Sequence, residues 1–200
     1  CVYLLVGQVV IAVEHVAEWG LGGRRNVTEP LVAVLRVPSG RPQQLDIQLA
    51  DFSADILIAS APGPASDAGF LCHVEDVWAH HVCDGTHQRE VREVPTPPGY
   101  QISCGETFQA PGMISSWPPH ANAEDLAKFR AGVTTWEEVF WVVAPSSGFA
   151  VLDGYYTPGQ PAYEVIRLEN GHAYQMPLGS HMCYASPESY LYYFWAYCGN

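Results

Sequence analysis

Residues 138–176 read EVFWVVAPSSGFAVLDGYYTPGQPAYEVIRLENGHAYQM, and this stretch is the clearest guide to the fold. Its apolar, β-branched and aromatic residues come in short runs, which predict strands near Glu138–Val143, Phe149–Tyr156, Tyr163–Leu168 and Ala173–Met176. Pro and Gly separate these runs, and the whole chain holds 16 Pro and 18 Gly with few long helical patterns. We therefore expect an all-β fold.

The same pattern continues on both sides of this stretch. Further strands are expected near 101–104, 114–117 and 190–197, and in the first half near 1–13, 31–37, 45–49 and 55–59. Each half carries a Pro-x-Gly turn after an apolar run, at Pro38-Ser39-Gly40 and at Pro177-Leu178-Gly179. Short strands in series with such turns predict two antiparallel barrels, or jelly rolls, in tandem.

Composition shifts suggest where these two barrels begin and end. Residues 1–65 are interpreted as the first barrel and residues 99–200 as the second. Residues 66–98 are polar and rich in His, and we interpret them as a connector with one short strand at Val91–Val94. A strand-like run starts at once and no initiator Met is present, so the first barrel is expected to be incomplete at its N-terminus.

Charge and composition exclude several classes of function. The chain of 200 residues is 48% hydrophobic and 15% charged, so it should fold, and its net charge is -12 with Lys128 as the only lysine. Without a basic patch, nucleic-acid binding is not expected, and an acidic surface repels an anionic membrane. A small anionic substrate remains compatible, because one Arg in a pocket can hold it.

The cellular compartment is predicted from the cysteines and from the start of the chain. The six cysteines are scattered without a CxxC pair, which favours reduced thiols, and the opening residues lack the features of a secretory signal. No apolar run reaches the roughly 20 residues that a membrane span needs. We expect a cytoplasmic protein.

Three segments carry the residues most suited to chemistry. They are Ser115-Ser116-Trp117-Pro118-Pro119-His120-Ala121-Asn122, then Trp136-Glu137-Glu138-Val139-Phe140-Trp141, then Gly171-His172-Ala173-Tyr174-Gln175-Met176-Pro177-Leu178-Gly179-Ser180-His181. A His at a strand end, a Glu on a following strand and a His after a Pro-x-Gly turn form the metal-binding pattern of cupins. Such ligands suit Zn, Mn or Fe, and strands that project them inward leave open positions for a substrate.

A family resemblance rests on these segments together with Gly105-Glu106-Thr107-Phe108-Gln109-Ala110-Pro111-Gly112 and the closing Ser189-Tyr190-Leu191-Tyr192-Tyr193-Phe194-Trp195. The chain resembles the 5-deoxy-glucuronate isomerases of inositol catabolism, which are related to the hexosulose-uronate ketol-isomerases of pectin breakdown. The resemblance is strong from about Arg89 onward. It implies a tandem cupin (bicupin) and an aldose–ketose isomerisation of 5-deoxy-glucuronate to 5-dehydro-2-deoxy-gluconate.

The resemblance also implies one divalent metal (Zn, Mn, Fe or Ni) in the second barrel and none in the first. The matching ligands are His120, Glu138 and His181, while Asn122 falls where the family has a second His. An amide oxygen is a poorer ligand than imidazole for these metals, so a weaker metal site is expected.

The expected chemistry needs a proton shuttle or a hydride shift, and the sequence favours neither. Glu137 and Glu106 are candidate bases. Glu106 is preferred, because neighbours on a strand face opposite ways and Glu138 should face inward. Substrate-binding candidates are Tyr156 and an Arg for the carboxylate, with Arg89 named first and Arg92 and Arg167 as alternatives.

Other functions stay open at this point. Asn122, together with the lack of a basic residue after Glu138, favours a bicupin that has lost catalysis and binds or senses a sugar acid. An Fe-dependent cupin oxygenase is a third option. The aromatic run 190–197 fits either a sugar pocket or plain core, and a loose cluster around His80 and His81 is more typical of a solvated connector than of a second metal site. The partners expected are a small anionic sugar and further copies of the chain.

Overall fold

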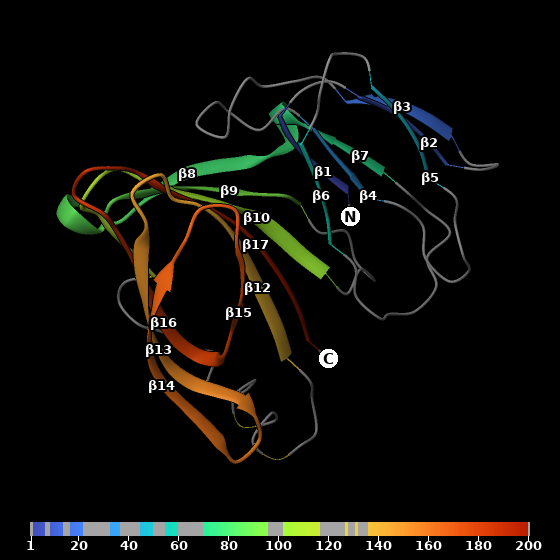
Figure 1. Cartoon of the computed structure of the whole chain (residues 1–200). Helices are drawn as coiled ribbons and strands as arrows, with labels where there is room; N and C mark the ends of the chain where they lie inside the picture. The colour runs from blue at the N-terminus through green and yellow to red at the C-terminus, as the bar shows by residue number, and fades with distance from the viewer. Residues whose placement is uncertain are drawn as a thin grey trace. The chain divides into compact units, whose positions relative to one another are not determined.

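The computed structural model describes residues 2–6, 9–13, 17–21, 33–36, 45–49, 55–59, 70–95, 102–116, 127, 131 and 136–199, and the chain divides into two compact units (Figure 1). The first unit is Cys1–Trp78 with Val94–Ser103, and the second is Ala79–Glu93 with Cys104–Asn200. The described residues form antiparallel strands and two 3-10 turns, η1 (Val74–Asp76) and η2 (Gly85–His87). No described helix is long and apolar enough for a membrane crossing. The predicted all-β fold in two tandem units is confirmed.

The first unit contains two small sheets. One has the strand order β6-β1-β4-β7 and the other has the order β3-β2-β5. Their strands are β1 (Val2–Val6), β2 (Val9–Val13), β3 (Ala17–Leu21), β4 (Ala33–Arg36), β5 (Leu45–Leu49), β6 (Asp55–Ile58) and β7 (Phe70–His73). The strands predicted near 1–13, 31–37, 45–49 and 55–59 are therefore present as β1, β2, β4, β5 and β6.

The second unit contains a six-stranded sheet, β15-β12-β17-β10-β9-β8, and a four-stranded sheet, β11-β16-β13-β14. Their strands are β8 (Trp78–Val82), β9 (Arg89–Glu93), β10 (Ile102–Gln109), β11 (Ile114–Ser115), β12 (Trp136–Val143), β13 (Gly148–Thr157), β14 (Gln160–Leu168), β15 (Ala173–Met176), β16 (Leu178–Ala185) and β17 (Leu191–Gly199). The two sheets stay separate in the described part of the chain.

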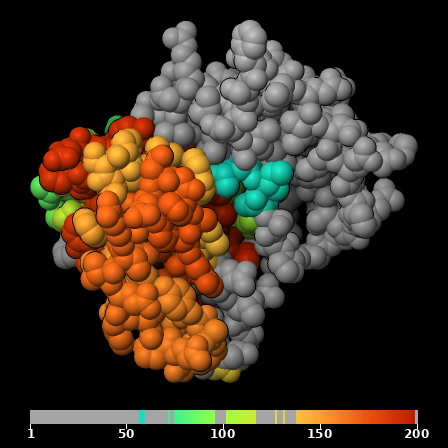
Figure 2. Space-filling view, in the orientation of Figure 1, coloured from blue at the N-terminus to red at the C-terminus, as the bar shows by residue number. Residues whose placement is uncertain are grey.

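The core of the second unit lies between its two sheets, because each strand turns alternate side chains inward. On β13, Ala150 and Leu152 are buried while Phe149 and Asp153 are exposed. Both sheets supply the main apolar cluster: Phe140, Val142, Ala144, Ala150, Leu152, Leu168, Met176, Cys183, Ala185, Leu191 and Tyr193. The hairpin of β13 and β14, in orange, forms much of the surface of this unit in Figure 2.

The segment 66–98, interpreted from sequence as a connector, contributes strands to both units. β7 pairs with β4 in the first unit, whereas β8 and β9 extend the six-stranded sheet of the second. The short strand predicted at Val91–Val94 corresponds to β9, Arg89–Glu93. Its charged residues mask the usual strand signal, since Arg89 and Glu93 line a polar pocket while Arg92 and Glu90 form an ion pair.

Strand β16 has no counterpart among the sequence-predicted strands. Gly179 lies inside this strand with a φ of 142°, and it pairs directly with Gly154 of β13. A Cβ atom added at Gly179 would lie 2.5 Å from the carbonyl oxygen of Asp153 and 2.6 Å from the Cα of Gly154. The Gly of the Pro177-Leu178-Gly179 motif therefore allows β13 and β16 to approach closely, two residues before His181.

Candidate active site

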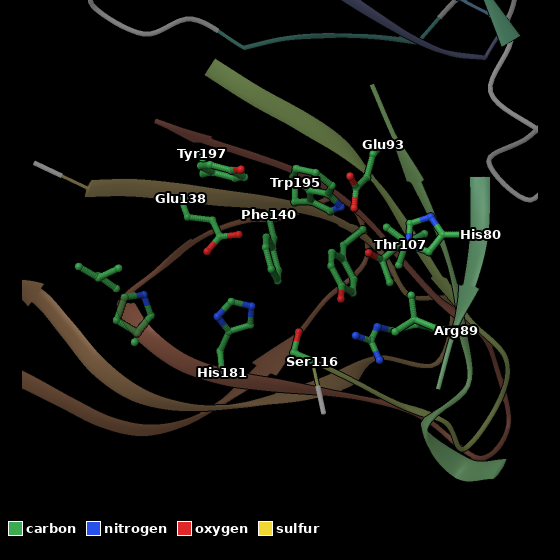
Figure 3. A pocket seen from close by; sticks show the side chains of 16 residues that line it. His80, Arg89, Glu93, Thr107, Ser116, Glu138, Phe140, His181, Trp195 and Tyr197 are labelled. Atoms are coloured by element: carbon green, nitrogen blue, oxygen red, sulfur yellow. The ribbon is translucent and has the colours of Figure 1, made fainter. Parts of the chain in front are cut away.

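A pocket of about 370 Å³ opens between the two sheets of the second unit. Its volume is in the range of small-molecule binding sites. Figure 3 shows Glu138 and His181 at one end and Arg89 at the other, with Ser116 between His181 and Arg89.

The first end is formed by Glu138 of β12 and His181 of β16, one from each sheet. Figure 3 shows the carboxylate and the imidazole pointing into the same space. The His181 ring meets the edge of Phe140, with ring centroids 5.1 Å apart and an interplanar angle of 83°. Two residues predicted as metal ligands from distant parts of the sequence are thus brought to one end of one pocket.

Glu138 is half-buried, and its carboxyl group takes no hydrogen bond or salt bridge from any described residue. Burial raises its pKa from 4.5 to about 7. An uncompensated buried carboxylate is costly, and a bound cation would remove that cost. A carboxylate beside an imidazole is also a donor set that divalent transition metals accept, so these residues fit a metal ion.

The other two predicted ligands, His120 and Asn122, lie outside the described residues, as does the side chain of Glu137. Within the described part of the chain, no three His, Cys, Asp or Glu side chains stand close enough together to bind a metal. The ligand set of four residues therefore stays a prediction, of which the structure describes Glu138 and His181.

Arg89 marks the opposite end of the pocket. Its guanidinium Nη1 donates hydrogen bonds to the Cys83 sulfur at 3.6 Å and to the His87 carbonyl oxygen at 3.4 Å. Both partners belong to the β8–β9 connection, where Cys83 has a φ of 61°. These contacts hold one nitrogen of the guanidinium, and Arg89 still faces the cavity in Figure 3. A guanidinium in this position can bind a carboxylate.

Aromatic rings also line the pocket. Tyr193, Trp195 and Tyr197 are alternate residues of β17 and face the cavity together. Tyr193 stacks on Phe140 with ring centroids 4.4 Å apart, and Trp195 stacks on Tyr197 at 5.9 Å. The sequence left open whether the aromatic run 190–197 lines a pocket or fills the core. Its odd-numbered residues from 193 onward line the pocket, while Tyr192 and Phe194 alternate with them on β17 and are absent from the pocket lining.

A hydroxyl pair joins the two sheets beside the pocket. The Tyr193 hydroxyl and the Ser115 Oγ are 2.8 Å apart, and Ser115 is fully buried. Burial raises the pKa of Tyr193, so its hydroxyl stays protonated at neutral pH. This hydroxyl is therefore a fixed hydrogen-bond donor or acceptor on a residue that lines the pocket.

The structure does not bring Glu106, the preferred base, into the pocket. Its neighbour Thr107 lines the cavity, so alternation on β10 turns Glu106 to the other face of the sheet. There its carboxylate accepts hydrogen bonds from Arg92 at 3.1 Å and from the Tyr192 hydroxyl at 2.6 Å, and it is 1% exposed. These contacts assign Glu106 a place in a buried ion pair.

The remaining candidates for substrate binding are also separated by the structure. Arg92 is buried with Glu106, and Arg167 is exposed and bonds to Ser147, so of the three arginines proposed only Arg89 lines the pocket. Tyr156 packs against the edge of the apolar core and is absent from the pocket lining. Burial and then the charge of Glu164 raise the Tyr156 pKa.

The sequence did not predict Glu93, Thr107 or Ser116 as pocket residues, and it left His80 in the connector. His80 and Glu93 come from the β8–β9 segment, and the usable signal was the alternation of Arg89, Val91 and Glu93 on one strand face. Their side chains add a second acidic group and an imidazole to the pocket wall.

Comparison with known structures supports the fold. An IolB-like protein from Salmonella typhimurium LT2 matches with a TM-score of 0.78 and 16% sequence identity, covering 99% of this chain and 74% of that one. AerE from Microcystis aeruginosa matches with a TM-score of 0.58 and 13% identity, covering 98% of this chain and 76% of that one. At these identities the likeness concerns the fold alone.

Comparison with protein families identifies the relatives of the chain. No protein with a curated description matches it. The model of the KduI/IolB family, which includes isomerases of uronates and related sugars, matches residues 1–200. The resemblance predicted from the sequence is thereby confirmed: the chain belongs to the KduI/IolB family.

Proposed function

We propose that this protein is a metal-dependent aldose–ketose isomerase of a uronic-acid-type sugar, with 5-deoxy-glucuronate as the substrate. The proposal rests on the different chemistry of the two ends of the pocket. Glu138 and His181, side chains of the types that bind metals, stand at one end, and Arg89, which can bind a carboxylate, stands at the other. A uronic acid has a carbonyl at one end of its chain and a carboxylate at the other.

The chain's own residues would bind and orient this substrate. Arg89 holds the carboxylate, which directs the carbonyl end toward Glu138 and His181. The aromatic rings of β17 exclude water from between the two ends. The protonated Tyr193 hydroxyl, fixed by Ser115, can donate a hydrogen bond to a substrate oxygen.

Glu138, His181 and the predicted His120 and Asn122 would hold the metal. When bound, a divalent ion supplies Lewis acidity that stabilises the negative charge developing on the two oxygens during isomerisation. Proton transfer and hydride shift both remain compatible with the groups around the pocket. A cytoplasmic location and association with further copies of the chain remain predictions of the sequence.

The decisive experiment combines elemental analysis of the purified protein with an isomerase assay on 5-deoxy-glucuronate. Near-stoichiometric Zn, Mn, Fe or Ni and metal-dependent turnover are expected in the wild type. Both should be lost in His181→Ala and retained in His172→Ala, a matched change at an exposed turn. Arg89→Met should raise KM while metal content stays the same.

The results also separate this proposal from its alternative. Absence of turnover at saturating metal would contradict the isomerase. If a uronic acid still binds, unaffected by metal or chelator, the protein is a sugar-acid binding module. Asn122, at the position where the family has a metal-binding His, would then explain the loss of the metal.

A further inference from the structure

A tryptophan ring in the pocket wall occupies the space that a side chain at Gly105 of the same unit would need. A Cβ atom added at Gly105 of β10 would lie 2.5 Å from Cζ2 and 2.9 Å from Cε2 of Trp195, and 2.5 Å from the carbonyl oxygen of Arg92. The indole of Trp195 therefore rests directly on the backbone of Gly105. Any larger residue there would push the ring away, since the backbone oxygen cannot retreat.

Glu93 stands at the same place on the neighbouring strand. Gly105 and Glu93 are directly paired in the register of β10 and β9. Both Glu93 and Trp195 line the pocket, and Figure 3 shows the carboxylate beside the indole, away from Glu138. A flat aromatic face and a hydrogen-bond-accepting carboxylate thus adjoin each other on the cavity wall.

This pair of groups suits a polyhydroxylated ligand. The C–H groups on one side of a sugar can lie against an aromatic face, and its O–H groups can donate to a carboxylate, which is a strong acceptor. The Glu93 carboxylate would repel a second anionic group at this position, whereas hydroxyls can donate hydrogen bonds to it. Arg89 meanwhile stands four residues away on the same face of β9, separated from Glu93 by Val91.

We propose that Trp195 and Glu93 form a hydroxyl-recognition subsite, positioned by Gly105, that binds the polyhydroxy portion of a monoanionic sugar acid. The subsite deepens the proposed function, on which its choice of ligand class rests. It explains how the pocket distinguishes a sugar acid from a plain carboxylic acid, which Arg89 alone cannot do.

The test measures binding of two six-carbon acids, D-glucuronate and hexanoate, to the metal-loaded full chain by calorimetry. Hexanoate has the carboxylate and lacks the hydroxyls. The wild type is expected to prefer D-glucuronate. Glu93→Gln and Trp195→Leu should each weaken D-glucuronate binding about tenfold or more, reducing that preference, without weakening hexanoate binding.

Matched control variants keep the result specific. Glu164→Gln changes an exposed acid of β14, and Trp141→Leu changes a tryptophan of β12, both outside the pocket lining. Both controls should keep the wild-type preference, and all variants should keep the wild-type metal content. An equal loss for both acids, a control that behaves like the pocket variants, or a wild type without D-glucuronate binding overturns the subsite.

The subsite and the isomerase fail in different ways. If the pocket variants lose the preference for D-glucuronate while the metal-loaded wild type turns over no 5-deoxy-glucuronate, the isomerase is contradicted and the subsite stands. If turnover is present and both variants bind D-glucuronate as the wild type does, the subsite is contradicted and the isomerase stands.

Discussion

The surroundings of Glu138 disfavour its charged form, since burial raises its pKa to about 7. It lies inside the second unit, faces the pocket, and has no ion-pair or hydrogen-bond partner among the described residues. A folded protein keeps such a group only when something else requires it, because the same position filled by an apolar residue would be more stable. The proposed metal ion is that requirement.

A pH dependence of stability follows from Glu138. Burial raises its pKa from 4.5 to about 7, so the folded, metal-free protein binds this proton more tightly than the unfolded chain does. The group's contribution is therefore full below about pH 4.5 and is lost as the pH rises through about 7. The loss amounts to about 3 kcal/mol at most.

Urea unfolding of metal-free wild type and Glu138→Gln at pH 5 and pH 8 measures this loss. The variant should gain stability relative to the wild type at pH 8, because it carries no buried charge. The same difference between the two proteins at both pH values would show that Glu138 is not buried as described.

Replacing Glu106 should destabilise the protein without affecting the pocket. Glu106→Gln removes one of the charged partners of the Arg92 guanidinium, in a place where Arg92 is 4% exposed. Removing one partner of a buried pair costs roughly 3 kcal/mol, so the free energy of unfolding should fall by that order. Metal content should not change, because Glu106 faces away from the pocket.

Chemical denaturation measures the free energy of unfolding of this variant, with Glu164→Gln, a change at an exposed acid, as the control. Loss of turnover at wild-type stability would instead support the catalytic role that the sequence suggested for Glu106.

At this scale, the sequence predicted the residues whose chemistry is unusual for their surroundings. Glu138 stands out amid an apolar run, and His181 follows a Pro-x-Gly motif. Arg89 could be named but not ranked, because only the fold shows which face of β9 meets the cavity. Trp195 could not be singled out within the aromatic run 190–197, since alternate aromatic residues of β17 serve the pocket and the opposite face of the sheet.

Among elements, strands with bulky inward residues were predictable and strands with small ones were not. β12 and β13 present Phe140, Val142 and Leu152 to the core and match the expected ranges. β16 turns Gly179, His181 and Cys183 inward, and such residues give no apolar alternation to detect. Its place was visible only as a Pro-x-Gly motif.

The close contact between β13 and β16 makes the protein sensitive to any side chain at Gly179. Gly179→Ala places a Cβ against the backbone of β13 at a positive φ, so it should destabilise the protein by more than about 2 kcal/mol. It should also weaken metal binding, because β16 carries His181.

The matched control is Gly159→Ala, at a positive φ of 78° in the exposed β13–β14 turn with nothing within 4 Å of the added Cβ. It carries only the conformational cost, about 1 kcal/mol. Thermal unfolding and metal titration of both variants check the comparison, and equal effects would refute the importance of the close approach.

For the whole molecule, the sequence predicted two units but could not show how the chain passes between them. The second unit is built from two separate segments, Ala79–Glu93 and Cys104–Asn200, with Val94–Ser103 belonging to the first. Polar composition made residues 66–98 look like a connector, because a pocket wall and a buried ion pair both need charged residues.

A truncated chain tests whether β8 and β9 belong to the second unit. Residues 99–200, the second barrel as read from the sequence, lack β8 and β9, and with them His80, Arg89 and Glu93 of the pocket. The truncation also exposes the edge of β10, a site for aggregation. We expect aggregation and no D-glucuronate binding in size-exclusion chromatography and calorimetry. Residues 79–200 should be more soluble, and a monomeric, ligand-binding 99–200 would contradict the assignment of β8 and β9.

Because the second unit is built from two separate segments of the chain, only some recombination events can preserve its pocket. The pocket is encoded by two blocks with a short stretch of the other unit between them. A recombination event that moves the pocket intact must carry that stretch along, and one that joins a foreign segment at it separates Arg89 from His181. The unit that contains the pocket cannot be inherited by itself, so the two units are expected to be kept together in evolution.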